Sequence, residues 1–470
     1  MTQNTRLRIL YIFSDYVSTL VALLLFVVAR FNYEPLAHSI GSVGAMMSTP
    51  MVRLEILLYP VLMLFVYWLT GYYEEVIMKS RIQELLQTLR STVAGVAAFF
   101  LIAMINDLDP DRLHTYKLLL ILACILFGCT YSVRLFVTSL VRKSVHQGSV
   151  SRRTLIVGNG RKAENMRDRL QAASKVMGLN VCGFVDDEPG SEREDGLPVF
   201  TFGEAAAQIA RGYIQTVVVI ASGKSVSATL DTINFFLPTE CSVLVDPEFY
   251  QELSAPVRTQ NVIGEPLVDV SHPAISGSTA NIKRCFDVVA SIVALLLLWP
   301  VMFVIAVLVK RDSPGPAIYS QQRIGRHKKP FTIYKFRSMY VDSETDGPRL
   351  SSDSDSRVTP LGRTLRKYRL DELPQFWNVL RGDMSLVGPR PEREFFIRRI
   401  IERAPSYALV QQVRPGLTSW GMVKFGYAST VGEMVERLRY ELIYIDNLSL
   451  LLDLRIILYT IKIVLTGKGI

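Results

Sequence analysis

Four runs of apolar residues in the N-terminal third constrain the fold of this chain more than any other feature. They lie at Leu10–Phe31, Leu54–Leu69, Thr92–Ile105 and Leu118–Val137. With its flanks, each run reaches about 20 residues, the length that the hydrocarbon core of a bilayer requires. Basic residues lie at the ends of the runs, on the same predicted side of the membrane. Four buried helices of a soluble bundle would not need this pattern. The runs therefore predict a transmembrane domain of four helices over residues 1–148.

The charges between the runs predict how this domain is oriented. Basic residues precede the first run, separate the second from the third and follow the fourth: Arg6, Arg8, Lys79, Arg81, Arg90, Arg142, Lys143, Arg152 and Arg153. The segment between the third and fourth runs instead carries Asp107, Asp109 and Asp111. By the positive-inside tendency, the N-terminus and all residues after 140 then lie in the cytoplasm.

The overall composition agrees with membrane segments beside charged globular ones. Of 470 residues, 49% are hydrophobic and 20% are charged, which excludes a disordered chain. The five cysteines form no CxxC pair, which predicts reduced thiols rather than disulfides or a zinc site. The net charge of +9 favours an anionic partner, and the candidates are a lipid headgroup, a nucleic acid and a phosphorylated substrate.

Residues 149–272 alternate between strand and helix patterns, which predicts a Rossmann-like cytoplasmic α/β domain with a parallel sheet. The expected strands lie at Arg153–Val157, Val181–Val185, Thr216–Ala221 and Cys241–Val245. After the first strand, Gly158 and Gly160 fit the pattern G-x-G-x-x-A. In that pattern a tight turn leads into a helix N-terminus that favours an anion, so both glycines are candidate cofactor-binding residues.

Two observations leave open whether this turn binds a dinucleotide. The next acidic pair, Asp186 and Asp187, follows Gly160 by more than the usual spacing of about 20 residues. The chain also lacks a Tyr-x-x-x-Lys pair, the proton-transfer couple of nucleotide-sugar epimerases and dehydratases. A structural or dimerising role for the domain is the alternative.

Two further apolar segments lie in the third domain, at residues 273–470. Phe286–Val309 measures about 36 Å as a straight helix, enough to span a bilayer. Basic residues flank both of its ends, and Pro300 near its middle removes a backbone hydrogen bond. We therefore expect a re-entrant helix over residues 284–311 that enters and leaves on the cytoplasmic side. The C-terminal stretch Leu448–Leu465 contains charges and predicts an interfacial amphipathic helix.

Beyond the re-entrant segment, two adjacent acids stand among many basic residues. Asp371 and Glu372 precede Pro374, which a helix tolerates only in its first turn. Both acids are therefore expected at a helix N-terminus, where the dipole favours their ionised forms and an attached phosphoryl group. The basic candidates around them are Lys335, Arg337, Arg363, Arg366 and Arg369. Such a set could bring Mg²⁺ and a phosphate together.

Two more arginines stand next to prolines, Arg390 between Pro389 and Pro391, and Arg414 before Pro415. A stiff backbone suits an arginine to planar, bidentate contact with phosphate. Each signal alone has a simpler explanation, since Asp-Glu pairs commonly cap helices and basic runs commonly form solvated faces. Their combination after a long apolar segment favours a site that handles phosphate.

With these motifs the chain resembles the bacterial polyprenyl-phosphate hexose-1-phosphate transferases, which begin capsule, O-antigen and exopolysaccharide assembly. The residues that carry the resemblance are Asp312–Pro316, Gln322–Gly325, Lys335–Met339, Leu370–Gln375, Asn378–Gly382, Met384–Pro391 and Arg414–Gly421. The four N-terminal runs and the Rossmann-like region look like the large members, typified by the undecaprenyl-phosphate galactose or glucose phosphotransferases. One departure is Trp299 before Pro300, where small members often carry a serine whose hydroxyl can bond a freed carbonyl.

The resemblance implies a multi-pass enzyme of the bacterial inner membrane, with both termini in the cytoplasm and a mainly α-helical catalytic domain. It would transfer a hexose-1-phosphate from a UDP-hexose to undecaprenyl phosphate and release UMP. By the same resemblance, Asp371 is the nucleophile of a phospho-aspartyl intermediate and Glu372 holds Mg²⁺. The residues expected to bind substrate phosphates are Lys335, Arg337, Arg363, Arg366, Arg390 and Arg414. A homodimer is a further expectation.

Two other functions remain as alternatives: a membrane-anchored nucleotide-sugar dehydratase, and a non-enzymatic regulator of polysaccharide export. The distribution of charge bears on this choice. Residues 281–470 hold 29 Lys and Arg against 18 Asp and Glu, whereas the rest of the chain is close to neutral. The excess therefore lies in the segment expected to meet lipid phosphate, nucleotide diphosphate and the membrane surface, and nucleic acid is not expected as a partner.

Overall fold

A computed structural model gives the architecture of the chain. It describes residues 3–33, 41–74, 77, 79, 81–106, 112–158, 160–186, 196–220, 226–239, 241–246, 267–270, 275–341, 349–350 and 355–467. The chain divides into two compact units. The first contains Met1–Ser151, Ala173–Leu179 and Ser276–Ile282, and the second contains Arg152–Ala172, Asn180–Ile275 and Lys283–Ile470. The division into three domains at residues 148 and 272 stays a prediction.

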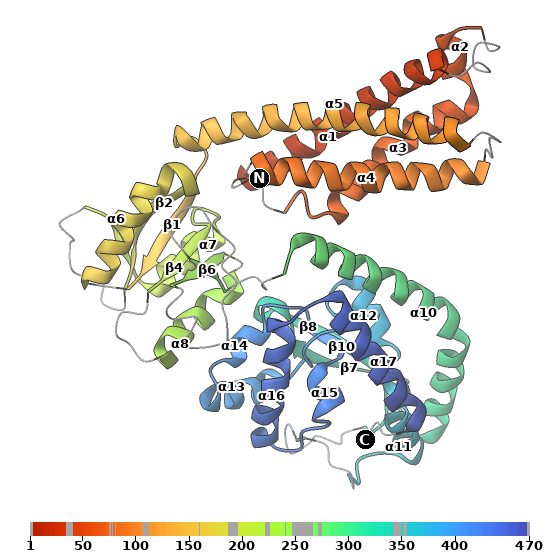
Figure 1. The fold of residues 1–470 in the computed structure, drawn as a ribbon. Coiled ribbons are helices and arrows are strands. Elements are labelled where there is room, and N and C mark those ends of the chain that lie inside the picture. Colours follow the sequence, from red (N-terminus) through yellow and green to blue (C-terminus); the bar gives the residue numbers. More distant parts are fainter. Residues whose placement is uncertain are drawn as a thin grey trace. The chain divides into compact units, whose positions relative to one another are not determined.

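Each of the four N-terminal apolar runs forms a long helix, and a short fifth helix lies between the first two (Figure 1). The elements are α1 (Gln3–Tyr33), α2 (Val43–Ser48), α3 (Pro50–Leu69), α4 (Arg81–Asn106) and α5 (Arg112–His146). All except α2 contain a stretch that is long and apolar enough to cross a membrane. The expectation of several apolar helices is confirmed. Asp107, Asp109 and Asp111, on which the orientation partly rests, lie outside the described residues.

The core of the first unit contains a buried ionic contact among its apolar side chains. Arg134 on α5 is fully buried, and its Nε and Nη2 donate to the Asp15 carboxylate on α1 at 2.8 and 2.9 Å. The Tyr73 hydroxyl donates to the same carboxylate at 2.9 Å. The guanidinium also lies 3.6 Å from the ring centroid of Tyr72. Both oxygens of Asp15 therefore have donors, and the buried cation has its counter-ion.

A second buried carboxylate lies in the same unit at the start of α4. The hydroxyls of Tyr72 and Thr138 donate to Glu84 at 2.9 and 2.6 Å. The ammonium of Lys79 lies 3.9 Å from a Glu84 oxygen and 3.1 Å from the ring centroid of Tyr72. Asp15, Lys79, Glu84 and Arg134, called the N-terminal cluster below, thus hold two acids and two bases that balance one another.

The middle of the chain forms the expected α/β sheet, whose strand order is β3-β2-β1-β4-β5-β6. Its elements are β1 (Arg152–Val157), α6 (Gly160–Met177), β2 (Leu179–Val185), β3 (Val199–Phe200), α7 (Phe202–Ala210), β4 (Thr216–Val219), α8 (Val226–Phe236), η2 (Leu237–Thr239), β5 (Ser242–Val245) and β6 (Val268–Asp269). β1 pairs in parallel with β4, and β4 with β5, whereas β6 runs antiparallel at the edge. All four residues of β4 are buried, as in the central strands of parallel sheets.

The predicted glycine turn joins β1 to α6. Gly158 and Gly160 have φ angles of 134° and 69°, which side chains with a Cβ rarely adopt, so the glycines have a structural reason to be there. Asn159 between them lies outside the described residues, as do Asp187 and the strand residue Ala221. Nucleotide binding at Gly158 and Gly160 stays a prediction.

The long apolar segment of the third domain forms the helix α10 (Gly277–Asp312). Pro300 lies inside this helix of 36 residues without ending it, and Figure 1 shows that the helix is curved. Most of its apolar side chains are exposed, Leu297 and Trp299 among them. The expected bend therefore appears as curvature in a continuous helix, and the re-entrant path through a membrane stays a prediction.

The chain after α10 folds into a mainly helical domain with two small sheets. Its elements are β7 (Ile318–Ile324), η3 (Arg326–Lys328), β8 (Pro330–Phe336), α11 (Pro360–Lys367), η4 (Leu370–Glu372), α12 (Gln375–Arg381), β9 (Ser385–Val387), α13 (Glu394–Arg403), α14 (Tyr407–Val410), β10 (Gly416–Thr418), α15 (Trp420–Lys424), α16 (Val431–Asp446) and α17 (Leu450–Thr466). β7 and β8 form an antiparallel hairpin, and β9 pairs in parallel with β10. A shared apolar core, to which β8, α12, α13 and α16 contribute, holds both sheets in place.

Candidate active site

The β7–β8 hairpin supplies one wall of the candidate site. Lys335 lies near the end of β8, directly opposite Tyr319 on β7. Because side chains alternate along a strand and opposed residues share a face, Ile333, Lys335 and Arg323 point to the same side of the hairpin. Ile333 lies between the two cations on that face and is buried, so it joins the hairpin to the apolar core.

The acidic pair lies in η4, the turn that leads into α12. Asp371 and Glu372 are both buried, at 6% and 8% exposure. Pro374 takes the N-cap position of α12, so the acids directly precede the helix, close to the place that the position of the proline predicts. Arg369 before them has a left-handed backbone, with φ of 52°, which turns the chain from α11 toward the acids.

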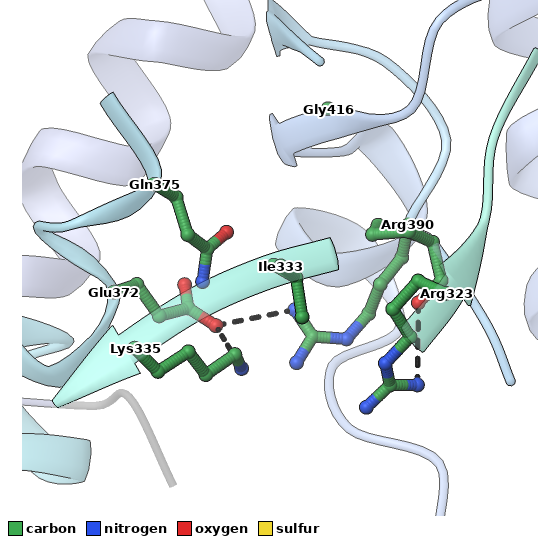
Figure 2. A pocket seen from close by; sticks show the side chains of 8 residues that line it. Arg323, Ile333, Lys335, Glu372, Gln375, Arg390 and Gly416 are labelled. Carbon is green, nitrogen blue, oxygen red and sulfur yellow. Dashed lines mark hydrogen bonds and ion pairs between the residues drawn. The ribbon is translucent and has the colours of Figure 1, made fainter. Parts of the chain in front are cut away.

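Glu372 is surrounded by basic side chains. Its Oε1 lies 3.2 Å from the Lys335 ammonium and 3.5 Å from Nη1 of Arg390, and Figure 2 shows both cations converging on this oxygen. Its Oε2 lies 3.7 Å from Nη1 of Arg369. The Asp371 carboxylate, by contrast, has no hydrogen bond among the contacts that set its pKa, although the charges of Lys335, Arg366 and Arg390 act on it as well. Glu372 therefore has direct ionic partners among the described residues, and Asp371 does not.

The pKa values follow from these environments. Burial favours the neutral form of Glu372, but Lys335, Arg390 and Arg369 outweigh it and lower the pKa of Glu372 to about 2. Burial and the adjacent Glu372 charge raise the pKa of Asp371 above its usual value. Burial also lowers the pKa of Lys335, against the opposing effect of Glu372. The ionised form of Glu372 is therefore stabilised by its surroundings, and the ionised form of Asp371 is destabilised.

Arg390 reaches Glu372 from the loop between β9 and α13. The small sheet beneath this loop is tied by backbone hydrogen bonds, from Gly388 to Thr418 and from Gly416 to Pro389. A Cβ on Gly416 would collide with the backbone of Gly388, so the close approach of these two segments needs glycine. The contact between these segments places Arg390 beside the hairpin. It also gives a structural reason for the motifs at 384–391 and 414–421, because each supplies one side of the contact.

The other basic candidates divide into those near the acids and those elsewhere. Arg366 on α11 donates to the Ser338 hydroxyl at 2.9 Å, and its charge acts on Asp371. Arg363 lies on an exposed part of the same helix. Their binding of phosphate stays a prediction.

Arg337 and Arg414 have structural partners. The Arg337 guanidinium donates to the carbonyl oxygens of Val309, Ser313 and Pro314, which closes the C-terminal end of α10. Arg414 donates to the Gly382 carbonyl at the end of α12. Neither residue lines the pocket around Glu372. These contacts give both arginines a structural role, and their binding of phosphate stays a prediction.

The structure adds three residues that the sequence reasoning did not select individually. Arg323 and Gln375 line the pocket with Glu372, Lys335 and Arg390 (Figure 2). Glu392 lies behind them, 3.6 Å from Arg323. The first two belong to motifs that the sequence analysis quotes, at 322–325 and 370–375. One signal could have found Arg323. If residues 318–336 are read as a hairpin, Arg323 opposes Phe331, and side chains alternate along β8, so Arg323 falls on the same face as Lys335.

Any metal at this site would rest on few protein ligands. The described residues contain no group of three or more His, Cys, Asp or Glu side chains that could hold a metal ion. Asp371 and Glu372 offer two buried carboxylates, which is the number that Mg²⁺ commonly takes from a protein when substrate phosphates complete its shell.

Comparison with known families gives two matches. Residues 278–467 match a family described as bacterial sugar transferase. Residues 68–221 match a family described as CoA-binding domain. The first match contains every residue of the candidate site, and the second covers β1, α6, β2 and β4 of the α/β sheet.

Curated relatives cover the same regions. A UDP-N-acetylgalactosamine-undecaprenyl-phosphate N-acetylgalactosaminephosphotransferase of Aeromonas hydrophila is 42% identical over 45% of this chain and 51% of its own. A UDP-glucose:undecaprenyl-phosphate glucose-1-phosphate transferase of Klebsiella pneumoniae is 33% identical over 61% of this chain and 62% of its own. The chain thus spans between about half and three fifths of the length of these two relatives.

A longer alignment joins this chain to an undecaprenyl-phosphate galactose phosphotransferase of Salmonella typhimurium. The two are 32% identical over 343 residues, which are 68% of this chain and 70% of that protein. Together with the match at residues 278–467, this coverage establishes the relationship. The chain belongs to the bacterial sugar transferase family.

Proposed function

We propose that this chain transfers a hexose-1-phosphate from a UDP-sugar to undecaprenyl phosphate and releases UMP, as the first membrane step of a surface polysaccharide pathway. The observation that carries the proposal is the pair of buried acids with opposite environments. Glu372 is held by three cations, whereas Asp371 next to it has no direct ionic partner among the described residues. Relatives with 32–42% identity bear names that state this type of reaction.

In the first half of the reaction, Asp371 acts as the nucleophile. A carboxylate oxygen attacks the sugar-bearing phosphorus of the UDP-sugar, and the bond from that phosphorus to UMP breaks, so that UMP leaves with the bonding electron pair. The raised pKa of Asp371 reflects poor stabilisation of its charge, and the charge is relieved when the bond to phosphorus forms. Lys335 and Arg390 contact Glu372 in the structure, and when the donor binds they would contact its phosphate oxygens instead.

In the second half, the phosphate of undecaprenyl phosphate attacks the same phosphorus. The aspartyl bond breaks, the Asp371 carboxylate is regenerated, and the product is a lipid diphosphate sugar. One phosphoanhydride replaces another, so positioning and charge neutralisation are the main contributions required of the protein. The two half-reactions let a soluble donor and a membrane-bound acceptor use one site in turn.

Magnesium fits this arrangement as an ion shared by protein and substrate. Glu372 is the proposed protein ligand, with Asp371 adjacent to it and diphosphate oxygens supplying further ligands. When bound, Mg²⁺ neutralises charge on the diphosphate. The cations already near Glu372 make a tight site without substrate unfavourable, so we expect metal binding to depend on the nucleotide.

For the membrane, we propose that α1, α3, α4 and α5 cross the bacterial inner membrane and that both termini lie in the cytoplasm. The distribution of basic residues supports this orientation. We propose that α10 is re-entrant, because basic residues flank both ends and Pro300 lies within a curved helix. Cysteines placed at residues 284 and 311 should react with a membrane-impermeant reagent from the same side. Reaction from opposite sides would replace the re-entrant path with a crossing.

We also propose that α17 lies in the membrane interface, and that the chain forms a homodimer. The buried face of α17 includes Asp453, which pairs with Lys283 at 2.6 Å, whereas Leu451, Leu458 and Leu465 are exposed. The α/β domain with its own core is the proposed dimerising element. Mass photometry of the chain in lipid nanodiscs should show particles that exceed empty nanodiscs by the mass of two chains.

The test of the function is UMP release by the full chain in nanodiscs, with a panel of UDP-hexoses, undecaprenyl phosphate and MgCl₂. Repeated release of UMP that needs both the lipid and the metal is expected for one sugar in the panel, and without lipid no more than one UMP per chain should be released. Continued release without lipid would indicate hydrolysis, and an NAD-dependent change of the sugar would support the dehydratase alternative. No turnover of any UDP-sugar would favour a non-enzymatic regulator.

A further inference from the structure

The pocket beside Glu372 is a small recess, and the reaction described above gives no role to two of the polar residues that line it, Arg323 and Gln375. We propose that Arg323 and Gln375 form a binding recess for one phosphoryl oxygen of a substrate, and that Glu392 positions Arg323 within it. The inference rests on the proposed function, since it assigns two further substrate-binding residues and one positioning residue to the same site.

The size of the recess restricts what it can hold. Arg323, Gln375, Lys335 and Arg390 line it with Glu372, and its volume is about 10 Å³. This is close to the smallest space that holds one water-sized group. A single oxygen atom that projects from a tetrahedral phosphate has this size, whereas a sugar ring or a base does not.

Two hydrogen-bond donors in its wall lack partners within the described part of the chain. They are Nε of Arg323 and Nε2 of Gln375, both inaccessible to solvent. Gln375 is only 2% exposed. A buried donor without an acceptor costs about 1–3 kcal/mol, so native proteins rarely keep two such donors in the lining of one pocket without a function. Both donors need the same kind of partner, an oxygen that accepts hydrogen bonds.

The charge of the recess selects an anionic oxygen. Arg323, Lys335 and Arg390 contribute three cations to its lining, and Glu372 contributes the single acid. Burial and the nearby Arg390 charge lower the pKa of Arg323, while Glu392 opposes them. An arriving phosphate would therefore relieve repulsion as well as satisfy the two donors.

Glu392 fixes the arginine from behind. One of its oxygens lies 2.6 Å from Nη2 of Arg437, and the other lies 3.6 Å from Nη1 of Arg323. The same Arg323 nitrogen lies 3.4 Å from the Pro391 carbonyl oxygen, a contact drawn in Figure 2. The Nη1 side of the guanidinium is thus held by the protein, and Nε is left for a ligand.

The test measures binding and turnover by the full chain in nanodiscs, for Gln375→Ala, Gln375→Glu and Arg323→Lys. The binding probes are UDP, for the donor, and undecaprenyl phosphate, for the acceptor. Gln375→Ala and Arg323→Lys should weaken binding of the affected probe by about tenfold, as expected for loss of a hydrogen bond to a charged group. Gln375→Glu should weaken it further, because it adds a like charge.

Matched controls separate this effect from general damage to the core. Gln412→Ala removes another buried glutamine, at 5% exposure, and Arg357→Lys changes a part-buried arginine that pairs with Asp355. Both controls should bind UDP and undecaprenyl phosphate as the wild type does. Thermal unfolding of each variant identifies the ones that fail to fold, and Gln375→Ala, the smallest change, then carries the test.

A loss confined to UDP assigns the recess to the donor, and a loss confined to undecaprenyl phosphate assigns it to the acceptor. Either result supports the inference. Wild-type affinity for both probes in folded Gln375→Ala and Gln375→Glu would overturn it, and the recess would then hold only water. Glu392→Gln should raise KM with little change in kcat if it acts through Arg323, and an unchanged KM would remove its positioning role. Failure of the wild type to turn over any UDP-sugar would instead contradict the proposed function.

Discussion

The molecule contains two buried clusters of charged side chains, and they are built in opposite ways. In the N-terminal cluster, Arg134 and Asp15 form a direct ion pair, and hydroxyl groups complete the hydrogen bonding of both carboxylates. The active-site cluster comprises Asp371, Glu372, Lys335, Arg369 and Arg390. In it, Glu372 contacts three cations directly, and nearby donors of Arg323 and Gln375 lack acceptors within the described residues. The acids of both clusters are buried, but the cations around Glu372 are partly exposed and outnumber the acid that they contact.

This difference separates a structural cluster from a binding site. A buried ion pair with complete hydrogen bonding fixes the arrangement of helices, and no ligand is needed to account for it. A buried cluster with surplus positive charge and unsatisfied donors is less favourable by itself, and a phosphate would complete it. Substitutions in the N-terminal cluster should therefore act mainly on stability, and those in the active-site cluster mainly on activity.

The largest expected effect is on turnover in Asp371→Asn. An amide cannot form the acyl phosphate, so kcat should fall by about 10⁴-fold or more, as for loss of a catalytic nucleophile. UMP release in the complete assay measures this. Thermal unfolding should show no loss of stability, because the raised pKa of Asp371 means that its charge disfavours folding at neutral pH. Normal turnover in this variant would remove the nucleophile assignment.

The next largest effect should come from breaking the N-terminal cluster. Asp15→Asn or Arg134→Met alone leaves one buried charge without its partner, which costs about 3–5 kcal/mol. The double variant should lose less than the sum of the two, because no unpaired charge remains. Unfolding midpoints in nanodiscs measure this coupling. Strictly additive losses would mean that the two residues do not stabilise each other.

Glu372→Gln should lower both stability and activity, and so combine the effects expected for the N-terminal cluster and for the active-site cluster. The pKa of about 2 shows that ionised Glu372 stabilises the fold above its unfolded pKa, and that this contribution is lost as the pH falls toward 2. Removing the charge at neutral pH should cost about 2–3 kcal/mol. Glu372→Gln should therefore unfold at a lower temperature than Asp371→Asn. The reverse order would contradict the opposite environments assigned to the neighbouring acids.

A smaller effect is expected in the pH dependence of turnover. The proposed nucleophile, Asp371, must be ionised to attack phosphorus, and its pKa lies above the ordinary value of 3.8. Activity should therefore fall as the pH drops through a value higher than that of an ordinary aspartate. The profile of kcat/KM between pH 4 and 8, with unfolding monitored in parallel, measures this. Full activity of folded enzyme down to pH 4 would show that the Asp371 charge is better stabilised than its surroundings indicate.

The sequence predicts much of the fold, and several of the residues that meet in the candidate site, because these depend on local patterns. Apolar run length marks α1, α3, α4 and α5, and strand–helix alternation marks the sheet. The position of Pro374 places the acids directly before a helix, as the structure has them. Clustering of the basic motifs identifies Lys335 and Arg390, which both contact Glu372.

Other features depend on residues that are far apart in the chain. Arg134 and Asp15 are 119 residues apart, and no local pattern pairs them. The motif around Arg337 predicts a phosphate ligand. In the structure, Arg337 contacts the end of α10, and only folding brings these two segments together. Arg323 and Gln375 become visible as a pair only when the hairpin and α12 line the same recess.

The central claim is that Asp371 takes the phosphosugar from the nucleotide before the lipid receives it. The direct measurement uses a UDP-sugar labelled at the sugar-bearing phosphorus, incubated with the full chain and Mg²⁺ without undecaprenyl phosphate. The label should become attached to the protein, map to the peptide containing Asp371, be absent in Asp371→Asn and move to lipid when undecaprenyl phosphate is added. Full transfer to lipid with no label on the protein at any time would contradict the account.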